Sequence, residues 1–455
     1  MTLRHLSKGL LLALSIGCIS LPVSANPFET TLDNGLKVIV KEDRRAPSVV
    51  NMVWYRVGSM DEIDGASGVA HVLEHLMFKG TENFASGEFN KRVAAMGGRD
   101  NAFTSRDYTA YFQQVPSERI GDVIGLEADR MRHLSFSDDE FSKEIEVVKE
   151  ERRLRTDDKP RSLVFEQLMA TAFVAHPYRR PIIGWMTDLE QMRADDARAW
   201  YRTWYAPNNA VVVIVGDVDH ENVFKQVQAA FGGFQPETLP ERRAIIEPEQ
   251  KGPRNAVVRA PAELPYVAMA WRAPTLKDLD KDTDVYALQV LAAVLDGHDG
   301  ARIPRNVVRG SQVAVSAGAG YDGTGRGESL FIVDGSPSRG KTVDDVQKAL
   351  LAEIAKIREE GVSEAELRRV KAQAIAGQIY EKDSLMGQAT EIGSLAAIGM
   401  SWQDEDLMIE KLRAVTADQV QDVARRYFSD ETLSVAVLEP VSIEATAPTA
   451  SAGHH

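Results

Sequence analysis

The stretch Gly68-Val-Ala-His-Val-Leu-Glu-His-Leu-Met-Phe-Lys-Gly80 holds the sharpest pattern in the chain. Residues four apart share one face of a helix, so the imidazoles of His71 and His75 can hold one cation, with Glu74 beside them. The order H-x-x-E-H is the inverse of the common zincin signature. A zinc ion there would lower the pKa of water toward about 7, and Glu74 suits the base that takes the proton. The alternative is a solvated helix face that carries these residues by chance.

A catalytic zinc ion usually has three protein ligands, so a third must come from elsewhere in the chain. The best source is the helix expected over residues 138–155, which carries Glu144, Glu146, Glu150 and Glu151. Glu144 and Glu151 are seven residues apart and therefore share a face. For Glu146 and Glu150 we favour a solvated face with pairs between glutamate and arginine.

Length and composition exclude several classes of protein. A chain of 455 residues exceeds one hydrophobic core and predicts two to four domains of roughly 100–200 residues each. The 44% hydrophobic and 26% charged residues are ordinary for a globular chain. The net charge of −14, without a basic stripe, disfavours binding of nucleic acid.

Residues 1–25 are expected to be a secretory signal peptide, with a positively charged start, an apolar run over residues 9–21 and the small end Val23-Ser-Ala25. The apolar run is shorter than the roughly 20 residues of a membrane-spanning helix, so we expect no transmembrane segment in the mature chain. The one cysteine, Cys18, lies inside this segment and excludes an intrachain disulfide. The expected location is the periplasm, and a lipid anchor at Cys18 is the alternative.

The rest of the chain alternates strands and helices in two halves. In the first half, strands are predicted over residues 36–40, 49–57, 108–115 and 210–216, and helices over residues 68–78, 120–134, 138–155 and 195–205. In the second half, strands are predicted over residues 266–271, 313–319 and 329–334, and helices over residues 285–295, 342–359 and 363–379. The expected organisation is a first domain over residues 26–233, a linker over 234–256, a second domain over 257–445 and a flexible tail over 446–455.

The two halves show an internal repeat. Sliding one over the other places Val72 on Val290 and Val148 on Val370 at nearly equal offsets, which predicts a duplication. The polar residues of the first half are not repeated: His71, Glu74, His75 and Glu151 fall opposite Gln289, Ala292, Ala293 and Gln373. We therefore expect one zinc ion per chain.

Several ordered motifs together resemble the pitrilysin family of zinc metallopeptidases, most closely its short two-domain bacterial members and the mitochondrial processing peptidase β subunit. Besides the stretch at 68–80, these motifs are Thr31-Leu-Asp-Asn-Gly-Leu36, Gly97-Gly98, Asn101-Ala-Phe-Thr-Ser105, Val147-Val-Lys-Glu-Glu151, His176-Pro-Tyr178, Pro181-Ile-Ile-Gly-Trp185 and Tyr205-Ala-Pro-Asn-Asn-Ala210. The resemblance implies an α+β fold of two duplicated α/β-sandwich domains, each with a mixed, mainly antiparallel sheet packed with helices. Together they would form half of a clamshell.

The resemblance also implies roles for individual residues. Glu151 corresponds to the third zinc ligand, and Glu144 to a carboxylate that supports activity from beside the ligands. Asn101 and Ala102 correspond to residues of an edge strand that bind the substrate backbone. From the residues alone, a turn after Gly97-Gly98 is the alternative for Asn101.

The resemblance further implies a partner chain. In the family, an Arg and a Tyr from a metal-free half contact the substrate, and the matching positions here hold Val308 and Val315. We expect a heterodimer with a related metal-free subunit that supplies this pair. A homodimer is the alternative, and Arg302, Arg305 or Arg309 would be local substitutes.

The expected function is that of a zinc-dependent endopeptidase that hydrolyses unfolded peptides or small polypeptides inside an enclosed chamber. The alternative is a non-catalytic assembly subunit of the same fold, as in the core proteins of respiratory complexes. Those proteins typically have eroded metal ligands, whereas this chain has the complete set.

Overall fold

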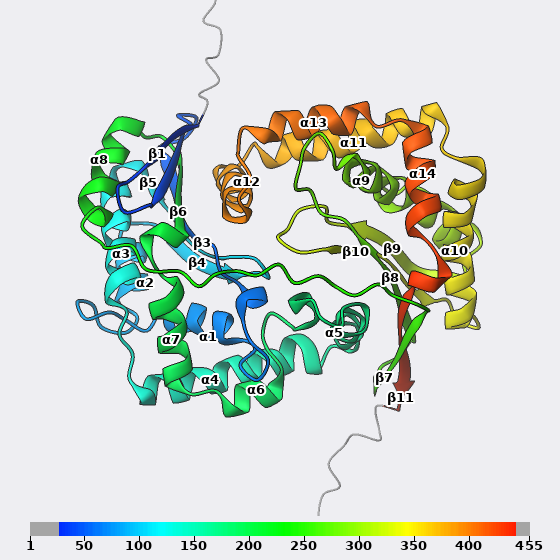
Figure 1. Ribbon diagram of the computed structural model, residues 1–455, viewed down its shortest axis with the longest axis horizontal. Helices are drawn as coiled ribbons and strands as arrows, with labels where there is room; N and C mark the ends of the chain where they lie inside the picture. The colour runs from blue at the N-terminus through cyan, green and yellow to red at the C-terminus, as the bar shows by residue number, and fades with distance from the viewer. Residues whose placement is uncertain (1–26, 443–455) are drawn as a thin grey trace, which may run out of the picture.

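The structure is a computed structural model that describes residues 27–442 and contains two sheets, one in each half of the chain (Figure 1). The first sheet has the spatial order β1 (Phe28–Thr31), β2 (Lys37–Glu42), β6 (Ala210–Gly216), β3 (Ser48–Tyr55), β5 (Thr109–Pro116) and β4 (Arg99–Thr104). The second has the order β7 (Arg254–Pro261), β11 (Ser434–Val441), β8 (Tyr266–Ala273), β10 (Ser329–Pro337) and β9 (Ala314–Tyr321).

The two sheets share one topology, apart from the additional strand β1 of the first. Each sheet has one parallel pair, β2 with β6 in the first and β7 with β11 in the second. The remaining neighbours in both sheets are antiparallel. The expected pair of duplicated domains with mixed, mainly antiparallel sheets is therefore confirmed.

Helices surround both sheets. Those of the first half are α1 (Val69–Leu76), α2 (Glu88–Ala95), α3 (Ile120–His133), α4 (Asp138–Arg152), α5 (Pro160–Ala172), α6 (Met186–Gln191), α7 (Ala194–Trp204) and α8 (His220–Phe231). Those of the second half are α9 (Thr283–Asp296), α10 (Val343–Glu360), α11 (Glu364–Glu381), α12 (Leu385–Ile398), α13 (Asp404–Ala414) and α14 (Ala417–Tyr427). Two π-helical segments, Arg153–Asp157 and Ile303–Gly310, complete the longer elements.

The apolar run of β6 is unbroken, and residues 49–55 of β3 are apolar except for the buried Asn51, because both faces of the first sheet are buried. Side chains alternate along a strand, so Val53 and Val212 lie in the core on one face, while Trp54 and Val213 lie in the core on the other. The first of these faces is covered by helices of the same half.

The other face of each sheet is covered by a helix from the opposite half. Helix α12 of the second half packs on β3 and β6, where Ala389, Ile392 and Ala396 contact the side of the sheet that holds Trp54. Helix α5 of the first half packs on β7, β8 and β11 through Val164 and Leu168. Figure 1 shows both helices between the two sheets, so the halves are joined by an exchange of helices.

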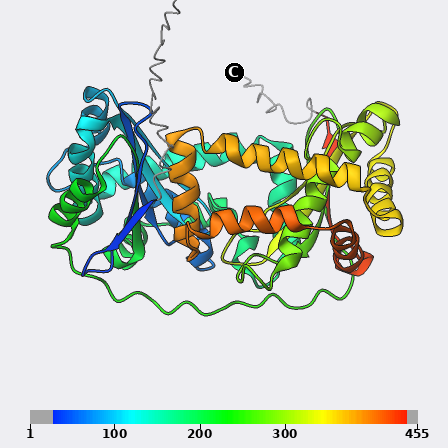
Figure 2. The same ribbon diagram turned by 90° about the horizontal axis from the view of Figure 1, so that it is seen from above.

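The segment 232–253 connects the halves without helix or strand and runs along the outside of the molecule (Figure 2). It is anchored by the buried Glu247, whose carboxylate accepts hydrogen bonds from the backbone N–H groups of Val174, Ala175 and His176 at 2.7–2.8 Å. Arg242 adds an ion pair with Asp61.

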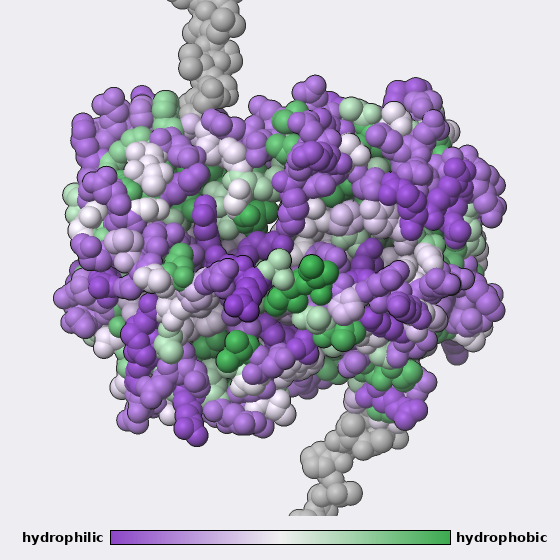
Figure 3. Space-filling model, viewed as in Figure 1, coloured by the Kyte–Doolittle hydropathy of each residue, from purple (hydrophilic) through white to green (hydrophobic). Residues whose placement is uncertain are grey.

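Most of the surface seen in Figure 3 is hydrophilic, with a few hydrophobic patches near the middle of the view. Within residues 27–442, none of the helices has the length and apolar character needed to span a membrane. The expected signal peptide, its Cys18 and the expected tail over 446–455 lie outside the described residues.

Candidate metal centre

Helix α1 is fixed in position by a close approach of two loops. Gly68 precedes it with φ of 90°, and a Cβ at this position would lie 2.5 Å from the carbonyl oxygen of Ile183. The buried carboxylate of Glu62 accepts hydrogen bonds from the N–H groups of Gly68 and Ala70 at 2.9 Å, which caps the start of the helix. The motif at 181–185 therefore supports the helix that carries the histidines.

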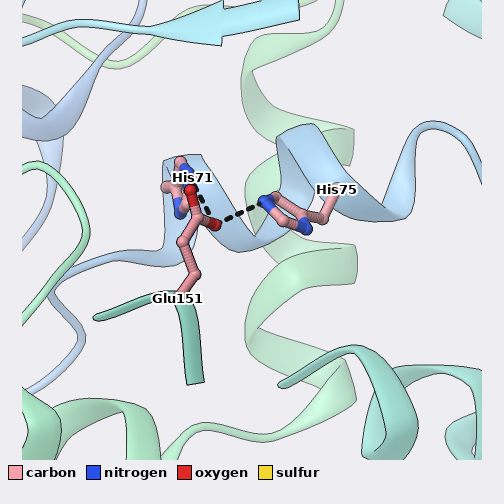
Figure 4. A group of neighbouring side chains, drawn as sticks. All are labelled: His71, His75 and Glu151. Carbon is pink, nitrogen blue, oxygen red and sulfur yellow. Dashed lines mark ion pairs between the residues drawn. The ribbon is translucent and has the colours of Figure 1, made fainter. Parts of the chain in front are cut away.

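His71, His75 and Glu151 meet between α1 and α4, as Figure 4 shows. Glu151 Oε2 lies 3.1 Å from His75 Nε2 and 3.8 Å from His71 Nε2. Ligands about 2.0–2.1 Å from a tetrahedral zinc ion are roughly 3.3 Å apart, so these spacings suit a shared cation. Within residues 27–442 this is the one group of at least three His, Cys, Asp or Glu side chains with that arrangement.

Two atoms of this group are buried without a hydrogen-bond partner among the described residues, Nδ1 of His71 and Oε2 of Glu151. Burial and the neighbouring His75 lower the pKa of His71 to about 3, so its imidazole is neutral near pH 7. Neutral imidazoles and a carboxylate are the donor set that zinc prefers. The residues present fit a zinc ion.

Glu144 orients the second histidine. Its Oε1 lies 2.9 Å from Nδ1 of His75, whose Nε2 faces Glu151. Burial alone would lower the pKa of His75, but the carboxylates of Glu144 and Glu151 outweigh it and raise that pKa. The second oxygen of Glu144 pairs with Lys79. A carboxylate on the far nitrogen of a metal-binding histidine fixes the tautomer and the ring direction.

Glu74 lies on the same helix, nearly buried, and is not one of the three converging residues. The hydroxyl of Thr104 donates a hydrogen bond to its Oε2 at 2.5 Å. Burial raises the pKa of Glu74, which brings this carboxyl group nearer to the range in which a general base accepts and returns a proton.

Asn101 and Ala102 lie on β4, which is the last strand of the first sheet. They pair with Phe112 and Tyr111 of β5, so the turn considered for Asn101 is wrong. The other side of β4 has no strand partner among the described residues. An unpaired edge offers N–H and C=O groups to an extended peptide.

A cavity of about 1000 Å³, here called the metal cavity, joins these features. His71, His75, Glu151, Glu74 and residues 101–104 line it, together with side chains of α5 and of the loop 179–183. Val308 and Val315, which were aligned with the Arg and Tyr positions of the family, do not line it.

The sequence alone did not identify Thr104, Lys79 or Arg155, which contact Glu74, Glu144 and Glu151. Lys79 lies in the stretch 68–80 and Thr104 in the motif at 101–105, so their places in these motifs could have indicated a role at the site. Arg155 lies in the π-helical segment after α4, where its guanidinium is 2.9 Å from Glu151 Oε1, and no sequence pattern marked it.

Comparison with known proteins gives two family matches in chain order. Residues 37–185 match the family described as Insulinase (Peptidase family M16), and residues 191–374 match the Peptidase M16 inactive domain. The zinc protease PqqE of Helicobacter pylori is 32% identical over 421 residues, which cover 90% of this chain and 92% of that protein.

Two further relatives agree. A probable mitochondrial-processing peptidase subunit beta of Arabidopsis thaliana is 26% identical over 427 residues, covering 90% of this chain and 78% of that protein. The crystal structure of a protease from Helicobacter pylori has a TM-score of 0.86 at 30% identity, covering 91% of this chain and all of that one. The chain therefore belongs to peptidase family M16, as a short two-domain member of this family of zinc metallopeptidases.

Proposed function

We propose that the protein is a zinc-dependent endopeptidase that cleaves unfolded peptides. The observation that carries the proposal is the convergence of His71, His75 and Glu151 beside Glu74 in one cavity. A zinc ion held by the three ligands supplies Lewis-acid polarisation of the peptide carbonyl and of water.

In this proposal the chain contributes a base and an orienting carboxylate. Glu74 takes a proton from the attacking water molecule and delivers it to the nitrogen of the departing amine. Thr104 holds one oxygen of Glu74, so the other is left to face the water. Glu144 keeps His75 oriented and thereby keeps the ligand set in place.

The substrate is held as an extended strand along β4. Backbone hydrogen bonds to Asn101 and Ala102 would bind any extended peptide with little dependence on its side chains. A folded domain cannot bring a single extended strand into a cavity of about 1000 Å³, so the proposal predicts unfolded peptides and small polypeptides as substrates.

The variant Glu74→Gln tests the function. We expect peptide hydrolysis to fall about 10²–10⁴-fold, because the base is lost while the side chain keeps its size. Zinc content and the circular dichroism spectrum should not change. The exposed Glu146, which pairs with Lys149 on α4, gives the matched control Glu146→Gln with full activity.

Unchanged hydrolysis in Glu74→Gln would refute the role of Glu74. If zinc-loaded wild type cleaves no peptide, alone or with its partner, the non-catalytic assembly subunit becomes the better description.

We further propose that the active form is a heterodimer of this chain, as the metal-bearing subunit, with a related metal-free subunit that supplies an Arg and a Tyr, and that the two enclose a chamber. The relative named as a subunit beta supports pairing, and the absence of Val308 and Val315 from the metal cavity supports an external source of these groups.

We also propose residues 26–233 and 257–445 as the two domains, and export to the periplasm after removal of residues 1–25. Purification from the native host and identification of what co-elutes tests partner and location together; a fully active homodimer would contradict the heterodimer.

A further inference from the structure

We propose that Arg106 binds a carboxylate group of the substrate, so that the protein prefers peptides carrying a carboxylate near the cleaved bond. The proposal rests on the proposed peptidase function. Arg106 lies in the turn between β4 and β5, two residues after Thr104. The residue therefore follows directly on the edge strand proposed to hold the peptide.

Arg106 stands where two cavities meet. It lines the metal cavity, and it also lines a second cavity of about 640 Å³ whose walls include β9, β10 and α12. Phe165, Met169 and Ile182 line both as well, so the two spaces adjoin along one wall. A peptide on β4 that extends past the metal ligands in the direction of the second cavity reaches Arg106.

The guanidinium of Arg106 has no hydrogen-bond or ion-pair partner among residues 27–442, and its Nε is buried. The guanidinium lies over the ring of Tyr178, whose centroid is 5.5 Å from Cζ. The adjacent carboxylate of Asp107 is already engaged, because it accepts hydrogen bonds from the Tyr178 hydroxyl at 2.6 and 2.8 Å and from the N–H of Arg326 at 3.2 Å.

The other arginines around the metal cavity are paired, and so are Glu150 and Glu166. Arg155 pairs with Glu151, Arg179 and Arg180 with Asp64, Glu150 with Arg153, and Glu166 with Arg152. Arg106 is thus the one arginine lining this cavity that forms no ion pair within residues 27–442, and the carboxylates of Asp107 and Asp322 act on it only from a longer distance.

An unpaired charge in a partly dehydrated position is unfavourable for folding. Burial lowers the pKa of Arg106, yet a guanidinium remains protonated in proteins. Its planar fork matches a carboxylate through two parallel hydrogen bonds. A ligand carboxylate would therefore supply the partner that the chain itself does not.

The charges of the second cavity place this ligand on the metal side. Five carboxylates line that cavity, namely Asp107, Asp296, Asp322, Glu328 and Asp334, and Arg106 is the only Lys or Arg among its described lining residues. An anion would be repelled there. The bound carboxylate therefore belongs to the part of the peptide between the metal ligands and Arg106.

Two groups of a peptide share this chemistry, the C-terminal carboxylate and the side chain of Asp or Glu. One fluorogenic peptide, made as free acid and as amide, tests the first. The same peptide with Glu or Gln at each position on either side of the cleaved bond tests the second. We expect one of these changes to raise kcat/KM of the wild type by about tenfold to a hundredfold.

The preference should disappear in Arg106→Gln, which should cleave the neutral peptides as wild type does, and should survive in part in Arg106→Lys. The exposed Arg119, which pairs with Asp122, gives the control Arg119→Gln with an unchanged preference. The melting temperature of Arg106→Gln should be unchanged or higher, because an uncompensated charge is removed. A merely structural arginine would lower it.

Equal cleavage of charged and neutral peptides by the wild type, or an equal loss on both in Arg106→Gln, would overturn the proposal. Failure of the peptidase function gives a different result, since no peptide is cleaved at all. The same labelled peptides are then tested for binding to the full chain by fluorescence anisotropy. Equal affinity of wild type and Arg106→Gln for the carboxylate form would overturn the proposal there too.

Discussion

His75 lies between two carboxylates, and each of its ring nitrogens has a separate task. Nε2 faces Glu151 at 3.1 Å, while Nδ1 faces Glu144 at 2.9 Å. A neutral imidazole that donates from Nδ1 keeps the lone pair of Nε2 for a metal ion. Glu144 therefore selects the tautomer that can bind zinc.

The variant Glu144→Gln is expected to bind zinc 10–100-fold more weakly, because an amide holds the His75 ring less firmly than a carboxylate. Competition with a chromogenic chelator measures this affinity. The control Glu146→Gln, on the exposed side of the same helix, should bind zinc as wild type does. Equal affinities for all three proteins would show that Glu144 does not act through the metal ligands.

The residues of the site differ in how far the sequence predicts them. The spacing of His71, Glu74 and His75 within one helix is a local property. It was enough to predict that His71 and His75 lie on one face of that helix. The family resemblance was needed to place Glu151 against α1, because the sequence of neither helix shows that α4 packs on α1. Among the described residues, Arg106 has no ion-pair partner because the neighbouring carboxylates are engaged elsewhere. Such a property depends on the tertiary structure, and no sequence motif predicts it.

Single elements were predicted well where their hydrophobic pattern was strong. The strand expected over residues 210–216 is β6, and the helix expected over 363–379 is α11. The exchange of α5 and α12 was not predicted, because an apolar helix face shows that the helix is buried and not which sheet it covers. Strand β4 has no fully buried residue, so its sequence pattern resembles that of a loop.

The packing of α12 depends on Gly393. A Cβ at this position would lie 2.1 Å from Nε1 of Trp54, which is fully buried on the first sheet. We expect Gly393→Ala to lower the free energy of unfolding by about 1–3 kcal/mol, because the helix must move away from the sheet. Urea unfolding followed by circular dichroism measures the change.

Gly125 of α3 gives the matched control. It is an exposed helical glycine, and a Cβ there would meet nothing within 4 Å. Gly125→Ala should raise the free energy of unfolding by about 0.5–1 kcal/mol through helix propensity. If both variants are stabilised, the contact of α12 with Trp54 is looser than the structure indicates.

Across the whole molecule, the two halves meet at a buried junction formed by His176, Tyr178 and the loop 325–327. The hydroxyl of Tyr178 accepts a hydrogen bond from the N–H of Gly327 at 3.0 Å. A Cβ at Gly327 would lie 2.2 Å from the ring of His176, so the loop packs directly on the imidazole. These segments lack regular periodicity, and the sequence therefore predicted the duplication of the halves but not how they join.

The junction predicts a dependence of stability on pH. Burial lowers the pKa of His176 to about 4, and its Nδ1 accepts a hydrogen bond from the N–H of Tyr178 at 3.2 Å. A folded pKa below the unfolded value of about 6.5 contributes stability above pH 6.5, and this stability is lost as the pH falls toward 4.

The variant His176→Asn keeps an acceptor near Nδ1 and removes the titration. Urea unfolding at pH 7.0, 5.5 and 4.5 should show a smaller loss of stability in the variant than in wild type. His71, whose pKa is also lowered, titrates in both proteins with the same sign, so the difference between them isolates His176. Parallel pH profiles would contradict the prediction.

The exchanged helices have a consequence for how this molecule arose. Helix α5 follows α4, and α12 follows α11, and the repeat pairs α4 with α11; the exchanged helices are thus equivalent elements. Two copies that trade the same helix have the connectivity of a domain-swapped dimer, here fused into one polypeptide through residues 232–253. Neither copy alone would cover its own apolar sheet face, which contains Trp54 in the first sheet and Ala268 and Ala270 of β8 in the second. The second half is therefore needed to bury the first sheet, although it has no counterparts of His71, Glu74, His75 and Glu151.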